Sequence, residues 1–384
     1  MDTLICGSTA YQHWRIPPIV TLLAAGPSDD PTLQKLMSED ELIAFRSSLL
    51  EQLPLLKACS RPWSRAGEEL KAIREASFLL APAATLPLEV LVSDASQRRP
   101  SNILKPKVNS YELPAGSTRY LTDEISIASP ELALLQIAAR ASLAQTVLMA
   151  SELCGGFAVY RAPAPIANVL QKLIDQERLP ALGGWKPCLS ANKKLGELWQ
   201  RPALTTPADL RHIAELSESP LGRKRLLKAT ELVKPEAASP FEVQAGIMIG
   251  FPVRYGGEGL GDFTHNAKVN LSQDARLLAG RDCCYCDLLW PDGLDIECQS
   301  AQFHDNGESF ISDSNRTAAL SLMGISVLPL TYEQLKQPRH FKAFTEAVAG
   351  ALNRKHHPKS EAQLAAAREL REDIFCDWWQ LPYL

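Results

Sequence analysis

The stretch Tyr285–Gln299, YCDLLWPDGLDIECQ, carries the strongest fold signal in the chain. Two apolar-rich runs flank the three residues Pro291–Gly293. Proline suits an early turn position, and glycine suits the left-handed position that a three-residue hairpin loop requires. The segment therefore predicts two antiparallel strands joined by a tight turn, in which Trp290 faces Leu294.

This register predicts which side chains meet across the hairpin. Asp287 falls opposite Glu297, and Tyr285 falls opposite Gln299. Because side chains alternate between the two faces of a strand, we expect Asp287, Glu297 and Gln299 on one face. The Cβ atoms of directly opposed residues lie about 4.5–5.5 Å apart. The sequence thus predicts two carboxylates side by side.

Opposed carboxylates repel each other, so the pair needs an explanation. A divalent cation can bridge them, one of them can stay protonated, or both can lie in water. Between Glu258 and Asp313 the chain has 11 acidic and three basic residues, in a chain whose net charge is only −4. This excess of carboxylates favours a magnesium-type cation, which binds carboxylates together with substrate phosphates. Solvated loop charge is the alternative.

The elements around the hairpin extend the prediction. Ser239-Pro240-Phe241-Glu242 is a helix start, and strands are expected over Ala267–Leu271 and residues 325–330, with a helix over residues 314–323 between hairpin and last strand. The order is helix, three strands, helix, strand. Glu242 also stands three residues after a serine, so it can complete a capping box instead of serving a catalytic site.

This order resembles the αβββαβ core of the PD-(D/E)xK, or restriction-endonuclease-like, superfamily. The segment IECQSAQFHDNGESFISDSNRTAALSLMGISVLPLT resembles its Vsr-like branch. SPELALLQIA, LGRKRLLKATELV and SPFEVQAGIMIGFPVRYGGEGLG resemble bacterial AbiEi-like proteins, which are antitoxins or regulators with an endonuclease-like C-terminal domain. The superfamily resemblance covers about residues 223–335.

The resemblance implies roles for five residues. Asp287 and Glu297 would be ligands of Mg²⁺ or Mn²⁺, and Glu242 would assist them. Gln299 stands where the family has a lysine that orients the attacking water; glutamine can donate a hydrogen bond but carries no charge. His304 would be a general base or ligand, although a lone loop histidine is more often an ordinary polar residue. Asp313 and Arg316 are expected to serve the structure, by capping and ion pairing.

Nucleic acid would need cations near the acidic face. The candidates are the residues that head one predicted helix: Arg223, Lys224, Arg225 and Lys228. They could hold phosphates, or they could form a solvated helix end. Two functions follow from the sequence. The first is a metal-dependent DNA endonuclease of bacterial defence, and the second is a catalytically inactive AbiEi-like antitoxin or transcriptional regulator with a toxin or regulatory partner. A protein-binding scaffold is a third possibility.

Composition bounds the remaining expectations. The 384 residues are 46% hydrophobic and 22% charged, which excludes a disordered or globally basic chain. No signal peptide or membrane span is expected, and the nine cysteines are expected to be reduced, so we expect a cytoplasmic protein. We expect an α+β or α/β chain with these parts: a helical region over 1–80, a small α+β domain over 81–156, a linker with short helices over 157–222, the endonuclease-like core over 223–335, and C-terminal helices over 336–384.

Overall fold

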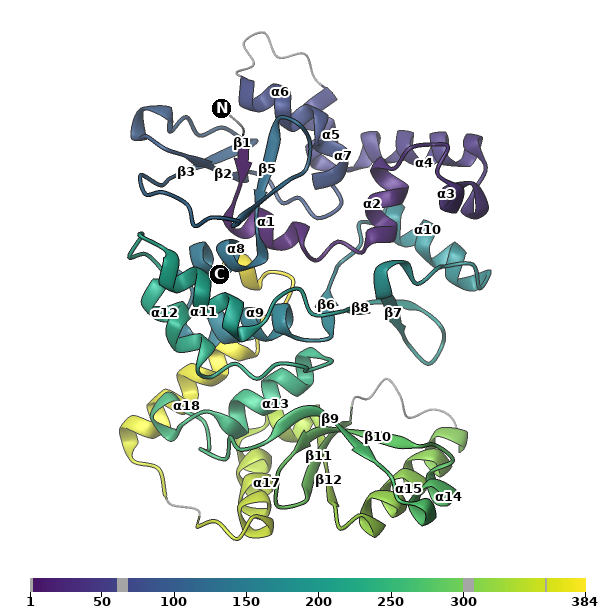
Figure 1. Cartoon of the computed structure of the whole chain (residues 1–384), viewed down its shortest axis with the longest axis vertical. Helices are drawn as coiled ribbons and strands as arrows, with labels where there is room; N and C mark the ends of the chain where they lie inside the picture. The colour runs from purple at the N-terminus through teal and green to yellow at the C-terminus, as the bar shows by residue number, and fades with distance from the viewer. Residues whose placement is uncertain (1–2, 61–67, 300–306, 356–357) are drawn as a thin grey trace.

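The computed structural model describes residues 3–60, 68–299, 307–355 and 358–384. It is a mixed α/β fold with three sheets, as expected in its class. Figure 1 shows the three sheets at successive levels along the long axis, with helices between and around them. No helix of the described residues is long and apolar enough to cross a membrane.

The first sheet has the strand order β3-β2-β1-β5-β4. Its strands are β1 Thr3–Ile5, β2 Leu88–Val92, β3 Leu104–Val108, β4 Thr118–Tyr120 and β5 Ile125–Ala128. The expectation of helices alone in the first 80 residues was wrong at β1, which pairs with both β2 and β5. Three residues are too few for a periodic signal, and the partners lie more than 80 positions further along the chain.

Helices follow β1 up to residue 80. They are α1 Gly7–His13, α2 Pro18–Ala25, α3 Pro31–Leu36, α4 Glu39–Gln52, α5 Pro54–Ser60, α6 Glu68–Glu75 and α7 Ser77–Leu80. Local signals explain several of their starts. Asp30 caps α3, and Ser38 with Glu41 forms the capping box of α4.

Two apolar helices form the centre of the molecule, where a single one was expected. Ser129 caps α8, Pro130–Ala138, as the sequence predicts. The helix ends early because Ser142 and Gln145 form a second capping box, which starts α9, Leu143–Cys154. Nearly every side chain of α9 is buried. These two helices therefore join the levels above and below them.

Residues 157–222 are not a linker. They form a second sheet of order β6-β8-β7, with β6 Phe157–Val159, β7 Lys186–Leu189 and β8 Leu195–Gln200, and two helices, α10 Ala164–Asp175 and α11 Pro207–Leu216. The strands are short, and proline and glycine interrupt β7 and β8, so they carry little local strand signal. Helix α12, Arg223–Thr230, follows and packs against α8, α9 and α11.

The third sheet has the order β12-β11-β10-β9 and carries the predicted hairpin. Its strands are β9 Thr264–Asn270, β10 Cys283–Leu289, β11 Leu294–Gln299 and β12 Ser326–Thr331. Strands β9, β10 and β11 are antiparallel neighbours, and β12 runs parallel to β11. The helices of this part are α13 Pro240–Gly250, α14 Gln273–Ala279 and α15 Gly307–Leu322. The predicted element order is thus present, with the short α14 as an addition.

Apolar side chains on the two faces of this sheet belong to different clusters. Leu288 and Ile296 join the main core, which includes α13 residues. Cys286 joins a smaller cluster with Ala319 and Leu320 of α15. The sheet therefore lies between α13 on one face and α14 with α15 on the other, as Figure 1 also shows.

The C-terminal part consists of helices α16 Tyr332–Lys336, α17 Pro338–Ala351 and α18 Glu361–Ile374, in agreement with the sequence. After α18 the chain returns to the first level. The backbone oxygen of Trp379 accepts a hydrogen bond from Gln12, and that of Pro382 accepts one from Ser8. Trp378 and Trp379 are both less than 10% exposed and serve as core contacts.

Candidate functional site

The turn at Pro291–Gly293 sets the register of the hairpin as predicted. The amide of Trp290 donates to the carbonyl of Leu294 at 2.8 Å, and Gly293 takes the left-handed conformation with φ of +80°. Leu288 pairs with Ile296, and Leu289 pairs with Asp295. These pairs confirm the predicted alignment of β10 with β11.

Asp287 lies where the regular pattern of β10 breaks. The backbone pairs of β9 and β10 skip this residue, opposite Asn266, whose φ of +46° is left-handed. Oδ2 of Asp287 accepts a hydrogen bond from the amide of Cys298 at 2.8 Å. The carboxylate therefore reaches across to the neighbouring strand, at the residue that follows Glu297. Strict alternation of faces does not hold at this position.

Helix α13 supplies a second acid. Glu242 is 7% exposed, and Oε2 accepts from the amide of Ala238 at 2.7 Å while Oε1 accepts from Ser239 Oγ at 2.7 Å. Ser239 Oγ in turn accepts from the amide of Glu242 at 3.2 Å. The capping role expected from the sequence is present. It also places the carboxylate beside the hairpin, where burial and the charge of Glu242 raise the pKa of Asp287.

Strand β11 carries two acids that share one cation. Arg316 of α15 lies with Nη1 2.7 Å from Oε2 of Glu297 and Nη2 3.9 Å from Oδ2 of Asp295. Arg316 also donates to the backbone oxygen of Tyr285. Its side chain is 14% exposed, and Asp295 is fully buried beside the thiol of Cys286. The structural role expected for Arg316 is therefore present, with Glu297 and Asp295 as its partners.

The electrostatics of the cluster disfavour full ionisation. Burial, with Glu242 and Glu297 nearby, raises the pKa of Asp287 to about 9. Burial raises the pKa of Glu242 to about 7, against the opposing hydrogen bonds from Ala238 and Ser239. Burial and the charge of Glu297 raise the pKa of Asp295 to about 7, although Arg316 opposes this shift. Without a further cation, the cluster therefore holds protons at neutral pH.

A fixed imidazole supports the strand behind Asp287. His265 on β9 is buried, and its Nδ1 lies 3.2 Å from the backbone oxygen of Asp287. Burial lowers the pKa of this histidine to about 4, so the ring is neutral at pH 7. Gly246 of α13 makes room for it, since a Cβ there would lie 2.7 Å from Nε2 of His265.

Two predicted site residues remain, Gln299 and His304. Gln299 ends β11, two positions after Glu297, and pairs with Thr331 of β12. His304 lies outside the described residues, so its predicted role stays a prediction. Within the described part, no group of three or more histidine, cysteine, aspartate or glutamate side chains has the spacing of a formed metal site. The acids are thus neighbours without being a closed coordination cage.

The predicted phosphate-binding cations lie elsewhere and are mostly engaged. Arg225 donates to the backbone oxygen of Ala138 at 2.6 Å, Arg223 donates to that of Ser217 at 3.4 Å, and Lys228 pairs with Glu231. Lys224 is exposed. All four are on α12, at the middle level of Figure 1, whereas the hairpin is at the lower level. The structure does not bring these cations to the carboxylates.

Sequence reasoning missed two parts of the site. It did not single out Asp295, although this residue has the same parity on β11 as Glu297 and could have been found by alternation. It also gave no role to His265, whose burial beside Gly246 depends on helix packing.

In comparisons with known proteins, the chain matches no family model, and neither curated proteins nor solved structures give a significant match.

Proposed function

We propose that this chain is a metal-dependent phosphodiester hydrolase that acts on DNA, with its catalytic centre at the β10–β11 hairpin. One observation carries the proposal. Three acids come from separate elements, Glu242 on α13, Asp287 on β10 and Glu297 on β11; together with burial, Glu242 and Glu297 raise the pKa of Asp287, and Glu297 raises that of Glu242. Such clusters of mutually perturbed acids are concentrated at functional sites. The element order resembles that of the PD-(D/E)xK superfamily.

The donor atoms fit a hard divalent cation. Carboxylate oxygens are the ligands that Mg²⁺ and Mn²⁺ prefer, and Mg²⁺ commonly uses one or two of them together with substrate phosphates. Asp287 has an oxygen, Oδ1, that accepts no hydrogen bond from the described residues. Asp287 and Glu297 would hold the ion, which when bound supplies charge for activating water and stabilising the phosphate.

Three residues of the chain would have separate roles in the reaction besides metal binding. Gln299 would donate a hydrogen bond that orients the attacking water, and Glu242 would accept one at the other side of the cluster. Arg316 would provide the positive charge that the family's lysine provides, because its guanidinium already lies 2.7 Å from Glu297. In the reaction, water forms a bond to phosphorus, the bond to the leaving oxygen breaks, and that oxygen takes up a proton.

Cleavage assays test this proposal directly. Purified protein is incubated with supercoiled plasmid, linear duplex, single-stranded DNA and RNA, each with Mg²⁺, Mn²⁺ or EDTA. We expect metal-dependent cleavage that Asp287→Asn abolishes. Asp292→Asn is the matched control, because Asp292 makes the same charge change in the exposed turn of the same hairpin. Absence of metal-dependent cleavage of every substrate, or equal activity of Asp287→Asn, would refute the proposal.

Arg316 gives a second, sharper variant. Arg316→Met keeps much of the apolar stem and removes the charge. If Arg316 replaces the lysine, this variant loses kcat while its metal affinity, followed by Mn²⁺ electron paramagnetic resonance, stays or increases. If Arg316 only neutralises Glu297, cleavage by the folded variant is unchanged or higher.

A second function is favoured by one specific observation. Glu297 is already paired with Arg316, and no lysine stands at position 299. A catalytically inactive protein with this fold would serve as an AbiEi-like antitoxin or regulator, with a toxin-like partner in the bacterial cytoplasm. This alternative predicts DNA binding that weakens with salt, shows no turnover and persists in Asp287→Asn.

A further inference from the structure

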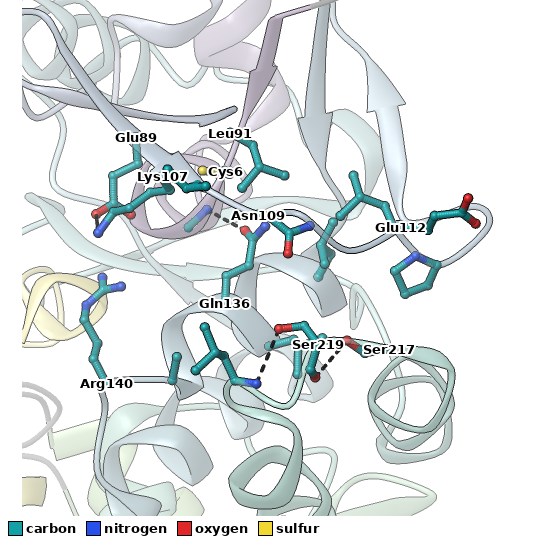
Figure 2. A pocket seen from close by; sticks show the side chains of 18 residues that line it. Cys6, Glu89, Leu91, Lys107, Asn109, Glu112, Gln136, Arg140, Ser217 and Ser219 are labelled. Atoms are coloured by element: carbon teal, nitrogen blue, oxygen red, sulfur yellow. Dashed lines mark hydrogen bonds and ion pairs between the residues drawn. The ribbon is translucent and has the colours of Figure 1, made fainter. Parts of the chain in front are cut away.

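A cavity of about 290 Å³ lies between the first sheet and α8, well away from the hairpin. The sheet contributes β2 and β3, α8 contributes Gln136 and the turn after it contributes Arg140, and the loop after α11 closes the far side. Figure 2 shows these side chains around the opening. Cavities between structural units, lined by apolar groups and a few polar ones, are typical small-ligand sites, and this volume suits a small one.

One end of the cavity is positively charged. Glu89 is 3% exposed; Oε2 accepts from the amide of Ser8 at 2.9 Å, and Oε1 lies 3.2 Å from Nζ of Lys107. Arg140 lines the same end and donates from Nη2 to Ser8 Oγ and to the backbone oxygen of Pro382. Lys107 and Arg140 line this end with Glu89, and Nζ of Lys105, outside the lining, lies 3.5 Å from the same Oε1 of Glu89, so positive charge is in excess here.

The geometry of this end is built into the backbone. Gly7 has φ of +53°, and a Cβ there would lie 2.2 Å from Oε2 of Glu89. Only glycine therefore allows the carboxylate to sit against the amide of Ser8. Because Glu89 is fixed by that amide and by Lys107, it is held as an anion, and the hydrogen bond and nearby cations lower its pKa despite burial. The guanidinium of Arg140 keeps unused donors, since Nη2 is its hydrogen-bonded nitrogen among the described residues.

The middle of the cavity is largely apolar and has the side-chain amides of Gln136 and Asn109. Leu91, Leu132 and Leu135 line it. Oε1 of Gln136 accepts from the amide of Gly7 at 2.8 Å, which leaves the amide nitrogen of this side chain as a donor. In Figure 2, Gln136 lies between the Glu89–Lys107 end and Ser219, while Glu112 stands on the opposite side from Glu89. The cavity is therefore polarised, with a cationic end, an apolar middle and an acidic side.

We propose that this cavity binds a small organic monoanion, a carboxylate on an apolar body, and that the carboxylate is held by Arg140 and Lys107. Because Lys105 and Lys107 both already pair with Glu89, Arg140 is the cation of this end with unused donors, which suits a monoanion better than a dianion such as phosphate. This inference is independent of the proposed hydrolase activity, because no residue of the hairpin takes part.

Isothermal titration calorimetry with the full chain tests the inference. The probes are phenylacetate and hexanoate, with phenylacetamide, acetate and inorganic phosphate as comparisons. We expect both carboxylates with apolar bodies to bind with a dissociation constant of about 1 mM or tighter, and the comparison molecules to bind at least about tenfold more weakly. Equal binding of phenylacetamide would overturn the charge requirement. Equal binding of phosphate would overturn the choice of carboxylate, and no binding of either probe would overturn the site.

Two variants locate the binding. Arg140→Gln removes one charge and should weaken phenylacetate binding by about tenfold or more, because hydrogen bonds to charged groups are the strong ones. Arg211→Gln is its control, since Arg211 is an exposed arginine paired with Glu215 on α11. Ala139→Trp fills the cavity from an exposed position directly after α8 and should abolish binding, and Ala208→Trp is the control on an exposed site of α11. Unchanged binding by folded Arg140→Gln or Ala139→Trp would overturn the proposal.

Discussion

Replacing Asp287 by asparagine should stabilise the protein at neutral and alkaline pH. The pKa of Asp287 is raised from 3.8 to about 9, so the folded state binds a proton that the unfolded state has released between these values. In that window stability falls as pH rises, by about 1.4 kcal/mol for each pH unit. At pH 7 the carboxyl of Asp287 lowers the free energy of unfolding by at most about 4 kcal/mol. A decrease of about 2–4 kcal/mol is expected, because Asp287 and Glu242 titrate as an interacting pair.

Asparagine removes this cost and keeps the local geometry. Its side-chain oxygen can still accept the hydrogen bond from the amide of Cys298 that Oδ2 of Asp287 accepts at 2.8 Å. In EDTA, the melting temperature of Asp287→Asn should therefore exceed that of the wild type by roughly 5 °C at pH 8. The two curves should converge as the pH falls toward 4, where the unfolded state of the wild type increasingly holds the proton as well.

Melting curves from pH 4 to pH 9, followed by circular dichroism, measure the difference. Asp292→Asn is the control, since Asp292 is exposed in the turn and its replacement should leave the pH profile unchanged. A lower melting temperature for Asp287→Asn at every pH, or a difference that does not vary with pH, would show that Asp287 is not held protonated by its neighbours.

Three further predictions use other contacts. When EDTA is replaced by millimolar Mn²⁺ at pH 8, the melting temperature of the wild type should rise and that of Asp287→Asn should not. An equal rise in both would argue against a cation at the hairpin. Gly246→Ala should lower the free energy of unfolding by about 1–3 kcal/mol, because its Cβ would lie 2.7 Å from Nε2 of His265. Urea unfolding measures it, and no loss would mean that the imidazole moves freely. Arg15→Met breaks a 2.5 Å ion pair with Glu152 in which both side chains are at most 2% exposed, and should lower the free energy of unfolding by about 3–5 kcal/mol. Arg161→Met breaks an exposed ion pair and should lower it by about 1 kcal/mol or less. Similar decreases in the free energy of unfolding for Arg15→Met and Arg161→Met would contradict the role of burial.

The hairpin could be predicted because its information is local. Pro291–Gly293 determines the turn, and the turn determines which residues of β10 and β11 pair. The caps at Ser129 and Ser239 were also evident, since each depends on residues within one helical turn. The neighbourhood of Asp287 and Glu297 follows from the same short-range rules.

The rest depends on contacts between distant parts of the chain. The break in alternation at Asp287 comes from the left-handed Asn266 on the neighbouring strand, which no pattern within β10 encodes. Arg316 lies 19 positions after Glu297, so its choice of partner is set by how α15 packs on the sheet. The sheet of residues 157–200 was missed because its strands are short, with proline and glycine inside two of them, and they pack on α9 and α10, which lie elsewhere in the chain.

The contacts of Trp379 and Pro382 with α1 have a consequence for biosynthesis. Ser8 and Gln12 lie more than 360 positions before their hydrogen-bond acceptors, so a ribosome exposes α1 long before it makes them. During that interval the first helix lacks part of its covering, and loop closure over such a span is slow. Until translation delivers Trp379 and Pro382, the nascent chain therefore exposes a surface of α1 that a holdase chaperone could cover.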